Sequence, residues 1–441
     1  MNSKKTLLFV FFIIVLLHIV FFIGALNYKG IYTTDSPEYK YCAENIYNYN
    51  TSYSASLDEN IKPEHFSLRP PGYPVFILFS KLIIDSDYTV LFIQNILSIL
   101  LLFLLYYKLN FYFNDKKKYL FIVGLIAFPI YLIMVNMIMA DILLGILLTI
   151  SWLFLDKFIK QQKYYYLLLF NVFLGFSAIT KPVMMYFWIV NIAYAIYLAI
   201  KYKKLYPLFM SLILVFVITL WTYRNYQKTN YFHFSSIKAK NLIDLNAGDV
   251  LIYKYGEDYK KQFIKHAKEK AYKLPTYKEQ SESLLNSAKE ILLGNPILYS
   301  ILHAKGMLNF MIAPGRIDVE TFLSLNTDKP ISLYREIEKR GFVNGLISYI
   351  NNVNIAFILL VIIIVIWNIF SLALLLLSFF SKKIDVSIRI FLFLLLLYII
   401  FASGSGGYAR FKTSIYFFML YLLPFGFDVV RVCWEKPNRL L

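Results

Sequence analysis

Long apolar runs alternate with short polar connections along most of this chain. A run of about 17 to 25 apolar residues is long enough for an α-helix to cross a bilayer. The pattern predicts about ten such spans, and the shorter run over 73–84 predicts a helix that lies at the membrane interface. The predicted spans cover 6–26, 88–107, 119–135, 138–155, 164–180, 183–200, 206–223, 354–380, 388–404 and 411–428.

The first apolar run follows Lys4 and Lys5, as the apolar core of a signal peptide would. It is nevertheless long enough to span, and no small-residue cleavage site follows it. We therefore expect a retained first span rather than a cleaved leader.

Lysines indicate how the spans are oriented. They gather in alternate short connections and in the C-terminal tail, whereas the short loops between carry few cations. By the positive-inside rule, the lysine-rich connections and both termini are cytoplasmic. The lysine-rich connections hold Lys108, Lys116, Lys117, Lys118, Lys157, Lys160, Lys163, Lys201, Lys203, Lys204, Lys382 and Lys383.

This orientation leaves two long segments outside and divides the chain into three parts. We expect an N-terminal membrane module over 1–223, with its first outer loop at 27–87 and interfacial helices in that loop. A small extracytoplasmic domain follows over 224–353, and a C-terminal membrane module over 354–441. Within the second part, 284–312 is amphipathic in places and interrupted at Gly294-Asn295-Pro296, which predicts two short helices. The expected fold class is an all-α integral membrane protein.

Composition agrees with this prediction. Apolar residues make up 59% of the chain and charged residues only 16%, whereas soluble domains carry about 25% charged residues. The mean hydropathy is +0.57. The formal net charge of +18 is concentrated at span ends, which favours the lipid bilayer over nucleic acid as the partner. The five histidines have no ligand spacing, so no metal is expected.

Ionisable residues of chemical interest lie at the predicted outer ends of spans rather than in their interiors. Pumps and ion-coupled carriers keep charged groups at mid-membrane, at about 2.5–3.5 kcal/mol each on insertion scales. The distribution here favours an active site at the outer surface over a conduit through the membrane. The residues concerned are Asp35, Arg69, Asp141, Lys181, Arg224 and Arg410.

Two carboxylates are the candidate acid–base groups. Asp35, in T-T-D-S-P-E-Y, can cap a helix that begins at Ser36, can face a cleft as a base, or can do both. Asp141 is the only charge across two adjacent apolar spans. It can complete a polar turn with Asn136, or it can act in a site, because a partly hydrated carboxylate needs a partner or a raised pKa.

Three cations are candidate ligands of a phosphate group. Arg69 precedes P-P-G-Y-P, a rigid corner that can hold a guanidinium fork against a phosphate. The alternative is a structural corner whose arginine reaches lipid headgroups. Lys181, before Pro182, has the same two interpretations. Arg410, in G-S-G-G-Y-A-R-F-K, follows glycines that allow a ligand to approach the backbone closely.

Together these residues resemble a known family. Asp35-Ser36, Tyr39 and Ala43, followed by Arg69-Pro70-Pro71-Gly72-Tyr73-Pro74, are similar to the first outer loop of the GT-C membrane glycosyltransferases. The resemblance is to the protein O-mannosyltransferase-like group (glycosyltransferase family 39) and the lipid A aminoarabinose transferases. Shorter similarities follow at Asp141, Trp221, Arg224-Asn225, Ser235-Ser236, Asn241-Leu242, Asn295-Pro296 and Arg410-Phe411-Lys412. Leu220 and Ser414 stand where relatives often have proline.

The resemblance implies an inverting transfer of one sugar from a polyprenyl-phosphate donor to a lipid, glycan or protein acceptor. The implied setting is the outer side of a bacterial cytoplasmic membrane. Asp35 would take the proton from an acceptor hydroxyl, and Asp141 would help to hold the acceptor or the sugar. No cofactor and no metal are implied. The implied phosphate ligands are Arg69, Lys181 and Arg410, and the implied substrate contacts are Tyr39, Tyr73, Arg224 and Asn225.

Two other classes of protein stay open on the sequence. A transporter or flippase of lipid-linked sugars would carry charge inside its spans and show related halves, and neither feature is visible in the sequence. A non-catalytic membrane scaffold of the same fold would keep the same carboxylates.

Overall fold

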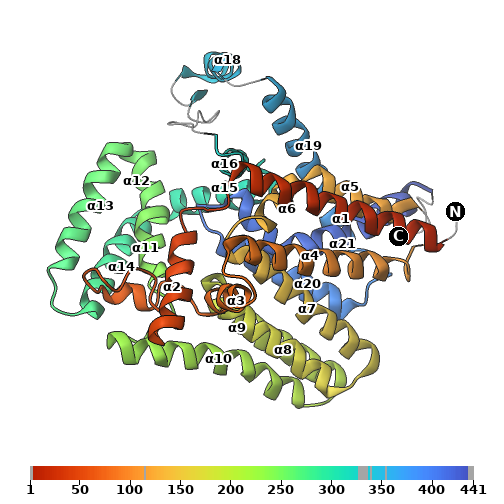
Figure 1. The fold of residues 1–441 in the computed structure, drawn as a ribbon, viewed down its shortest axis with the longest axis horizontal. Helices are drawn as coiled ribbons and strands as arrows, with labels where there is room; N and C mark the ends of the chain where they lie inside the picture. The colour runs from red at the N-terminus through yellow and green to blue at the C-terminus, as the bar shows by residue number, and fades with distance from the viewer. Residues whose placement is uncertain (1–2, 114–115, 326–335, 338–339, 353–354, 436–441) are drawn as a thin grey trace.

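A computed structural model describes the chain except for residues 1–2, 114–115, 326–335, 338–339, 353–354 and 436–441. The described residues form helices joined by loops, with no strand among them, so the predicted all-α class is confirmed. Figure 1 shows the long helices packed side by side in a bundle, with α11 to α14 grouped at one end.

Among the described residues, seven helical stretches are long and apolar enough to cross a membrane, or eight if one bent pair is counted as a span. The chain therefore has the character of a multi-pass membrane protein, although the predicted count of about ten spans is not confirmed. Five of these spans lie within single helices: α1 (Ser3–Tyr28), α4 (Asp87–Leu109), α7 (Ala140–Gln161), α10 (Tyr206–Thr229) and α19 (Ile355–Ser378). The other two each join a short turn to the helix that follows it: Pro182–Tyr202 combines η3 (Pro182–Tyr186) with α9 (Phe187–Tyr202), and Ala409–Val432 combines η5 (Ala409–Lys412) with α21 (Thr413–Glu435).

The bent pair replaces the straight span expected over 119–135. It consists of α5 (Leu120–Ala127) and α6 (Pro129–Val135), and the 12-residue stretch that opens at Lys116 meets α6 at 64°. Proline lacks an N–H and disfavours helical geometry in the residue before it. Phe128 accordingly leaves the helical region, with φ −124° and ψ 75°. The bend places α6 inside the bundle, where all of its residues from Ile130 to Val135 are buried.

Two further predicted spans are helices of less than spanning length. At a rise of about 1.5 Å per residue, they reach roughly 22–26 Å, which is less than the hydrocarbon thickness of about 30 Å. They are α8 (Tyr164–Ala178), with 15 residues, and α20 (Val386–Ala402), with 17.

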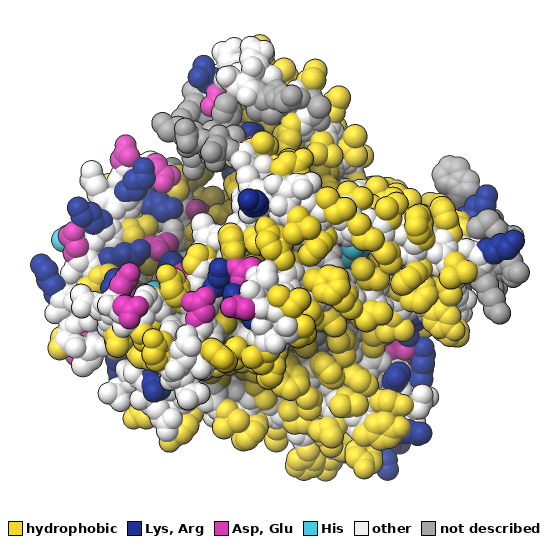
Figure 2. All heavy atoms as spheres, viewed as in Figure 1, with side chains coloured by type: hydrophobic (Ala, Val, Ile, Leu, Met, Phe, Trp, Pro, Cys, Tyr) yellow, Lys and Arg dark blue, Asp and Glu magenta, His cyan; other side chains and the backbone are white. Residues whose placement is uncertain are grey.

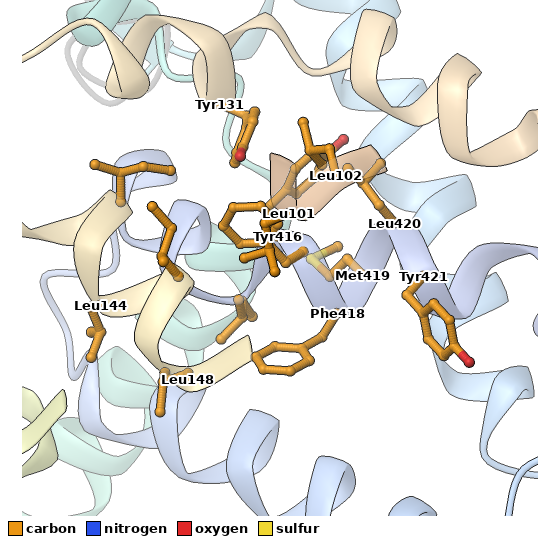
Figure 3. Packing of buried hydrophobic residues seen from close by; sticks show 14 of the residues in the cluster. Leu101, Leu102, Tyr131, Leu144, Leu148, Tyr416, Phe418, Met419, Leu420 and Tyr421 are labelled. Atoms are coloured by element: carbon orange, nitrogen blue, oxygen red, sulfur yellow. The ribbon is translucent and has the colours of Figure 1, made fainter. Parts of the chain in front are cut away.

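The centre of the bundle is α21. Its residues 415–425 are buried almost without exception, and its side chains pack against α4, α6 and α7 (Figure 3). Backbones approach closely here, since a Cβ on Gly426 would lie 1.9 Å from the carbonyl oxygen of Leu374 in α19. In a bilayer, van der Waals packing of this kind stabilises helix association. The short turn η5 (Ala409–Lys412) leads directly into α21, so the best-packed helix also fixes Arg410.

The segment predicted to form the first outer loop, 27–87, holds two helices and a short turn. They are α2 (Ser36–Tyr49), η1 (Pro63–Phe66) and α3 (Gly72–Lys81). The expected short helix over 73–84 thus corresponds to α3.

Between α10 and α19 lies a second group of helices with a small core of its own, built mainly from alanine, leucine and isoleucine. The predicted break at 294–296 is confirmed, because α14 ends at Leu293 and α15 begins at Pro296. The exact limits of a separate domain over 224–353 stay a prediction. The helices are α11 (Ile237–Asn241), η4 (Leu242–Ala247), α12 (Gly248–Tyr255), α13 (Glu257–Tyr272), α14 (Tyr277–Leu293), α15 (Pro296–Ile312), α16 (Arg316–Phe322) and α18 (Phe342–Asn352).

Apolar and charged side chains are separated on the surface, as apolar runs and charged connections are in the sequence. Figure 2 shows a broad band of apolar side chains over the bundle, with charged side chains gathered at its two ends. A band of this kind suits contact with lipid.

Candidate functional site

The starts of α2 and α7, which are far apart in the sequence, lie side by side at one end of the bundle. The loop before α2 is bonded to the loop before α7: Ile138 N–H donates to the carbonyl oxygen of Ile31 at 2.9 Å, and Ser36 Oγ donates to the carbonyl oxygen of Ile138 at 2.8 Å. These bonds hold the start of α2 beside the start of α7, and therefore bring the elements that carry Asp35 and Asp141 together.

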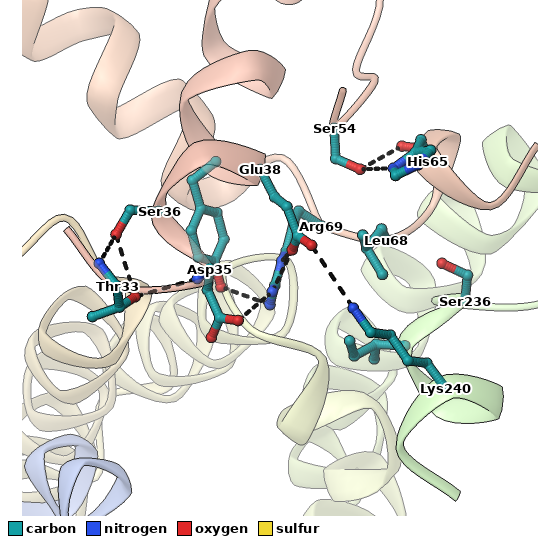
Figure 4. Close-up of polar contacts among 12 residues, drawn as sticks. Thr33, Asp35, Ser36, Glu38, Ser54, His65, Leu68, Arg69, Ser236 and Lys240 are labelled. Atoms are coloured by element: carbon teal, nitrogen blue, oxygen red, sulfur yellow. Dashed lines mark hydrogen bonds and ion pairs between the residues drawn. The ribbon is translucent and has the colours of Figure 1, made fainter. Parts of the chain in front are cut away.

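Asp35 occupies the N-cap position of α2, but its side chain makes no capping hydrogen bond. Its carboxylate instead lies 2.9 Å from Nη2 of Arg69 and 3.1 Å from Nη2 of Arg410. Figure 4 shows Asp35 and Arg69 facing each other. The side chain is 25% exposed, so solvent reaches it. The side chain therefore does not act as a helix cap and pairs instead with two arginines; its role as a base stays a prediction.

Arg69 is almost entirely enclosed, with a side chain 7% exposed. Its Nε lies 2.6 Å from Oε2 of Glu38, and the ring of Tyr39 lies 4.8 Å beneath the guanidinium carbon. Arg69 thus has two carboxylate partners, Asp35 and Glu38, as Figure 4 shows. These contacts compensate for the burial of the guanidinium charge, because a buried charge is stable only when it is paired and hydrogen-bonded.

The proline–glycine corner after Arg69 packs on the loop that carries Lys181. Gly72 N–H donates to the carbonyl oxygen of Ile179 at 2.7 Å, and a Cβ on Gly72 would lie 2.7 Å from that same oxygen. Glycine is therefore required for this close backbone approach. The corner brings Arg69 and Lys181 to the same region.

Asp141 is fully buried at the first turn of α7, and Lys181 is its ion-pair partner. Only Oδ1 takes part in that pair; Oδ2 is buried and has no hydrogen-bond partner among the described residues. The ring of Phe411 lies 4.6 Å from the Lys181 ammonium. Asp141 and Lys181 therefore form an ion pair that is in contact with the ring of Phe411, the residue after Arg410.

Arg410 has capacity for a further acceptor. Its Nη2 donates to Asp35. Its Nε is buried and has no hydrogen-bond partner in the described structure. The next lysine, Lys412, points away into the core, where it donates to the carbonyl oxygen of Met311 and lies 4.1 Å from the Phe128 ring centre. Lys412 thus holds the turn η5 against the core, whereas Arg410 contacts Asp35 in the candidate site.

The electrostatics of the site favour an ionised Asp35. Burial raises the pKa of this carboxyl, but the positive charges of Arg69, Arg410 and Lys181 outweigh burial and bring the pKa below its ordinary value of 3.8. Asp35 is therefore a carboxylate at neutral pH. It is ready to accept a proton, although the arginines weaken it as a base.

Two acidic residues that were not expected in the site lie around this centre. Glu38 pairs with Arg69, and its Oε1 lies 3.9 Å from Nζ of Lys240 in α11. Burial raises the pKa of Asp318 in α16 to about 6, opposed by Arg410 and assisted by Asp141. The spacing of Asp35 and Glu38, three residues apart at a helix start, was a usable signal. The sequence around Asp318 offers none.

The remaining predicted site residues support the first outer loop. Tyr39 and Tyr73 are fully buried, and Tyr73 donates to Oε1 of Gln94 at 2.8 Å. Arg224 donates to the carbonyl oxygens of Phe66 and Ser52. Their contact with a substrate stays a prediction.

Asn225 has a comparable place, since its side-chain amide donates to the carbonyl oxygen of Phe234 at 2.8 Å. Both Arg224 and Asn225 lie within α10, which continues to Thr229. The predicted start of the extracytoplasmic domain at 224 thus falls within the last turns of α10, and its limits stay a prediction. No group of three or more His, Cys, Asp or Glu side chains in the described part of the chain is placed to hold a metal ion.

Residues 68–223 match the family model of the dolichyl-phosphate-mannose-protein mannosyltransferases. The resemblance to membrane glycosyltransferases is confirmed. The matched segment begins just before Arg69 and includes Asp141 and Lys181. Together with the apolar helices, it supports a membrane glycosyltransferase.

Among solved structures, the chain is similar to the crystal structure of ArnT from Cupriavidus metallidurans in the apo state. The identity is 10% and the TM-score is 0.36, with 96% of this chain and 80% of that chain covered. No curated protein matches the sequence.

Proposed function

We propose that this protein transfers a sugar from a polyprenyl-phosphate donor to an acceptor hydroxyl at the outer surface of the cytoplasmic membrane. The observation that carries the proposal is the Asp35 carboxylate held between Arg69 and Arg410, 2.9 and 3.1 Å away. A carboxylate beside two guanidinium groups provides a proton acceptor and a site for an anionic leaving group.

The reaction has a simple balance. The acceptor oxygen attacks the anomeric carbon of the sugar, and its proton passes to Asp35. The bond between the anomeric carbon and the phosphate oxygen breaks on the opposite face, so the configuration inverts. The polyprenyl phosphate leaves with an added negative charge, which cationic side chains stabilise. In this scheme Asp141, through Lys181, holds the sugar or the acceptor.

The three predicted phosphate ligands then differ in role. Arg69 is enclosed and shared by two carboxylates, so it positions Asp35. Lys181 is engaged by Asp141. Arg410 has one carboxylate partner and an unused Nε donor, and is therefore the first ligand of the phosphate.

Donor binding and base strength are coupled in this arrangement. A phosphate that replaces the Asp35 carboxylate on Arg410 neutralises one of the charges that lower the Asp35 pKa. Asp35 becomes a stronger base once the donor is bound. Proton transfer to Asp35 is therefore less favourable before the donor binds.

The direct test is a reconstituted transfer assay. The purified protein in vesicles is supplied with a radiolabelled polyprenyl-phosphate sugar or with the same sugar on a nucleotide, and with extracts containing lipid, glycan and protein acceptors. Transfer from the lipid-linked donor alone, at the outward-facing surface, supports the proposal. Transfer from the nucleotide sugar would contradict it.

A further inference from the structure

A groove lies between α13 and the turn η4, in the second group of helices. Its volume is about 590 Å³, within the usual range of about 300–1,000 Å³ for ligand sites. The lining side chains of α13 extend from Lys260 to Tyr272, so at about 1.5 Å per residue the groove is roughly 18 Å long. This length suits an extended chain better than a single small ion. The lining residues are Asp244, Lys260, Lys261, Ile264, Lys265, Lys268, Glu269 and Tyr272.

Positive charge is in excess in this groove. Four of its lining residues are lysines and two are acidic. The closest pair is Lys268 with Asp244, whose Nζ and Oδ1 lie 2.8 Å apart. Lys261 and Lys265 lie 3.9 and 4.0 Å from carboxylates that are largely exposed, and exposed pairs of this kind contribute little. The groove can therefore take a further anionic partner.

Lys260 makes no hydrogen bond or ion pair with any residue that the structure describes. Its side chain lies across the start of α12, where a Cβ on Gly248 would be 2.7 Å from Cε of Lys260. Glycine at this position therefore leaves the space in which the lysine lies. Lys260 is thus a cation without a counter-charge in the wall of the groove.

The apolar side chains of α13 pack inward. Ala267 and Ala271 are buried in the small core of this group of helices. Phe263 and Ile264 pack against that core. A helix that binds in the membrane interface needs an exposed apolar face opposite its charges, whereas the exposed face of α13 is mainly charged. Figure 1 shows α13 at the edge of the group, on the side away from the bundle. The groove therefore suits a ligand from the aqueous side rather than lipid headgroups.

The wall of the groove is connected to the candidate site. α11 and η4 form one continuous helical stretch, in which Lys240 lies about one turn before Asp244. Nζ of Lys240 is 3.9 Å from Oε1 of Glu38, and Glu38 pairs with Arg69, the partner of Asp35. The groove and the Asp35 carboxylate therefore belong to one continuous polar surface.

We propose that the groove binds a polysaccharide that carries carboxylate or phosphate groups, and that this polysaccharide is the acceptor of the sugar. The inference rests on the proposed function. The anionic groups lie against Lys260, Lys261 and Lys265. Tyr272, which is 54% exposed, offers an aromatic face to a sugar ring. The chain continues toward Asp35, so that one of its hydroxyl groups is the nucleophile and loses its proton to that carboxylate.

Binding is measured without sugar transfer, by fluorescence anisotropy of labelled probes added to the full-length protein in phosphatidylcholine nanodiscs. The probes are oligogalacturonate with its uncharged methyl ester, and phosphorylated dextran with unmodified dextran. We expect an anionic probe to bind about tenfold more tightly than its neutral counterpart. Lys261→Gln combined with Lys265→Gln weakens that binding by about fivefold to tenfold. The control, Lys278→Gln with Lys289→Gln, removes two exposed lysines from α14 and leaves binding unchanged.

Use of the polysaccharide as acceptor is measured separately, in the reconstituted transfer assay. Lys261→Gln with Lys265→Gln should raise the KM for the anionic acceptor by about fivefold to tenfold and leave the KM for the donor unchanged. Absence of transfer to any acceptor would count against the proposed function. The binding result is independent of that outcome, because anisotropy requires no catalysis.

Three results would overturn the inference. The first is equal binding of the charged and neutral probes by the wild-type protein. The second is equal weakening in both double variants, which would show a general effect of net charge. The third is a loss of phosphatidylglycerol retention in Lys261→Gln with Lys265→Gln while binding of the anionic probe persists, which would identify lipid headgroups as the partner.

Discussion

The guanidinium of Arg410 lies 3.1 Å from the carboxylate of Asp35, although 375 positions separate the two residues in the chain. Arg410 is held by the turn that opens the central helix α21, and Asp35 by the start of α2. This contact joins the N-terminal loop to the C-terminal module at the point where we propose that the sugar is transferred. It predicts that the donor phosphate competes with Asp35 for Arg410.

Replacement of Arg410 should weaken donor binding. Arg410→Gln removes the charge and most of the donor capacity offered to the phosphate, so the KM for the lipid-linked donor rises by about tenfold to a hundredfold. Lys240→Gln is the matched control, because Lys240 lies nearby but touches Glu38 rather than Asp35. A donor KM unaffected by Arg410→Gln would exclude Arg410 as the phosphate ligand.

Replacement of Arg69 should act first on stability. Arg69→Met leaves Asp35 and Glu38 without their enclosed partner, and loss of one member of a buried ion pair destabilises by about 3 kcal/mol. Adding Glu38→Gln should restore part of the melting temperature but none of the activity. If Arg69→Met folds as well as wild type and only the donor KM rises, Arg69 is a phosphate ligand rather than a positioning residue.

The lowered pKa of Asp35 predicts a specific pH dependence of stability. The carboxylate stabilises the folded state above its unfolded pKa of about 3.8, and this contribution is lost as pH falls through the lower folded pKa. The difference in melting temperature between wild type and Asp35→Asn should therefore be largest at neutral pH and shrink in acid. A difference that stays constant down to the most acidic pH at which the protein is soluble would argue against the ion pairs.

The pKa of Asp318 is shifted in the opposite direction to the pKa of Asp35, so its pH dependence of stability is also opposite. Because the folded state raises its pKa from 3.8 to about 6, protonated Asp318 is favoured in the fold, and the associated stability is lost as pH rises through 6. Asp318→Asn mimics the protonated form. It should raise stability by about 1 kcal/mol above pH 6, since solvent screens part of the shift, and have little effect near pH 4. An equal gain at both pH values would show that Asp318 does not titrate in this way.

Much of the site could be predicted because each member lies next to a strong local signal. Asp35 stands at the end of an apolar run, Arg69 at a proline–glycine corner, and Lys181 directly before a proline. The helix class and the break before Pro296 follow from periodicity and proline chemistry. The bend at Phe128 was missed, although Pro129 marks it, because hydropathy reports an apolar run without reporting its direction.

The partners of these residues could not be predicted. That Asp35 pairs with Arg410, and that Lys181 pairs with Asp141 rather than standing free for a phosphate, depends on how helices distant in the sequence pack together. Asp318 lies in α16 with no motif around it, and its proximity to Arg410 and Asp141 is a property of the fold alone.

The most direct test of the central claim is to measure donor binding and sugar transfer side by side in Asp35→Asn. Asp85→Asn is the control, since Asp85 is an exposed carboxylate in the same outer loop. We predict that Asp35→Asn binds the polyprenyl-phosphate sugar at least as tightly as wild type, because Arg410 is released, but transfers it about a hundredfold or more slowly. Wild-type transfer by Asp35→Asn would contradict the account.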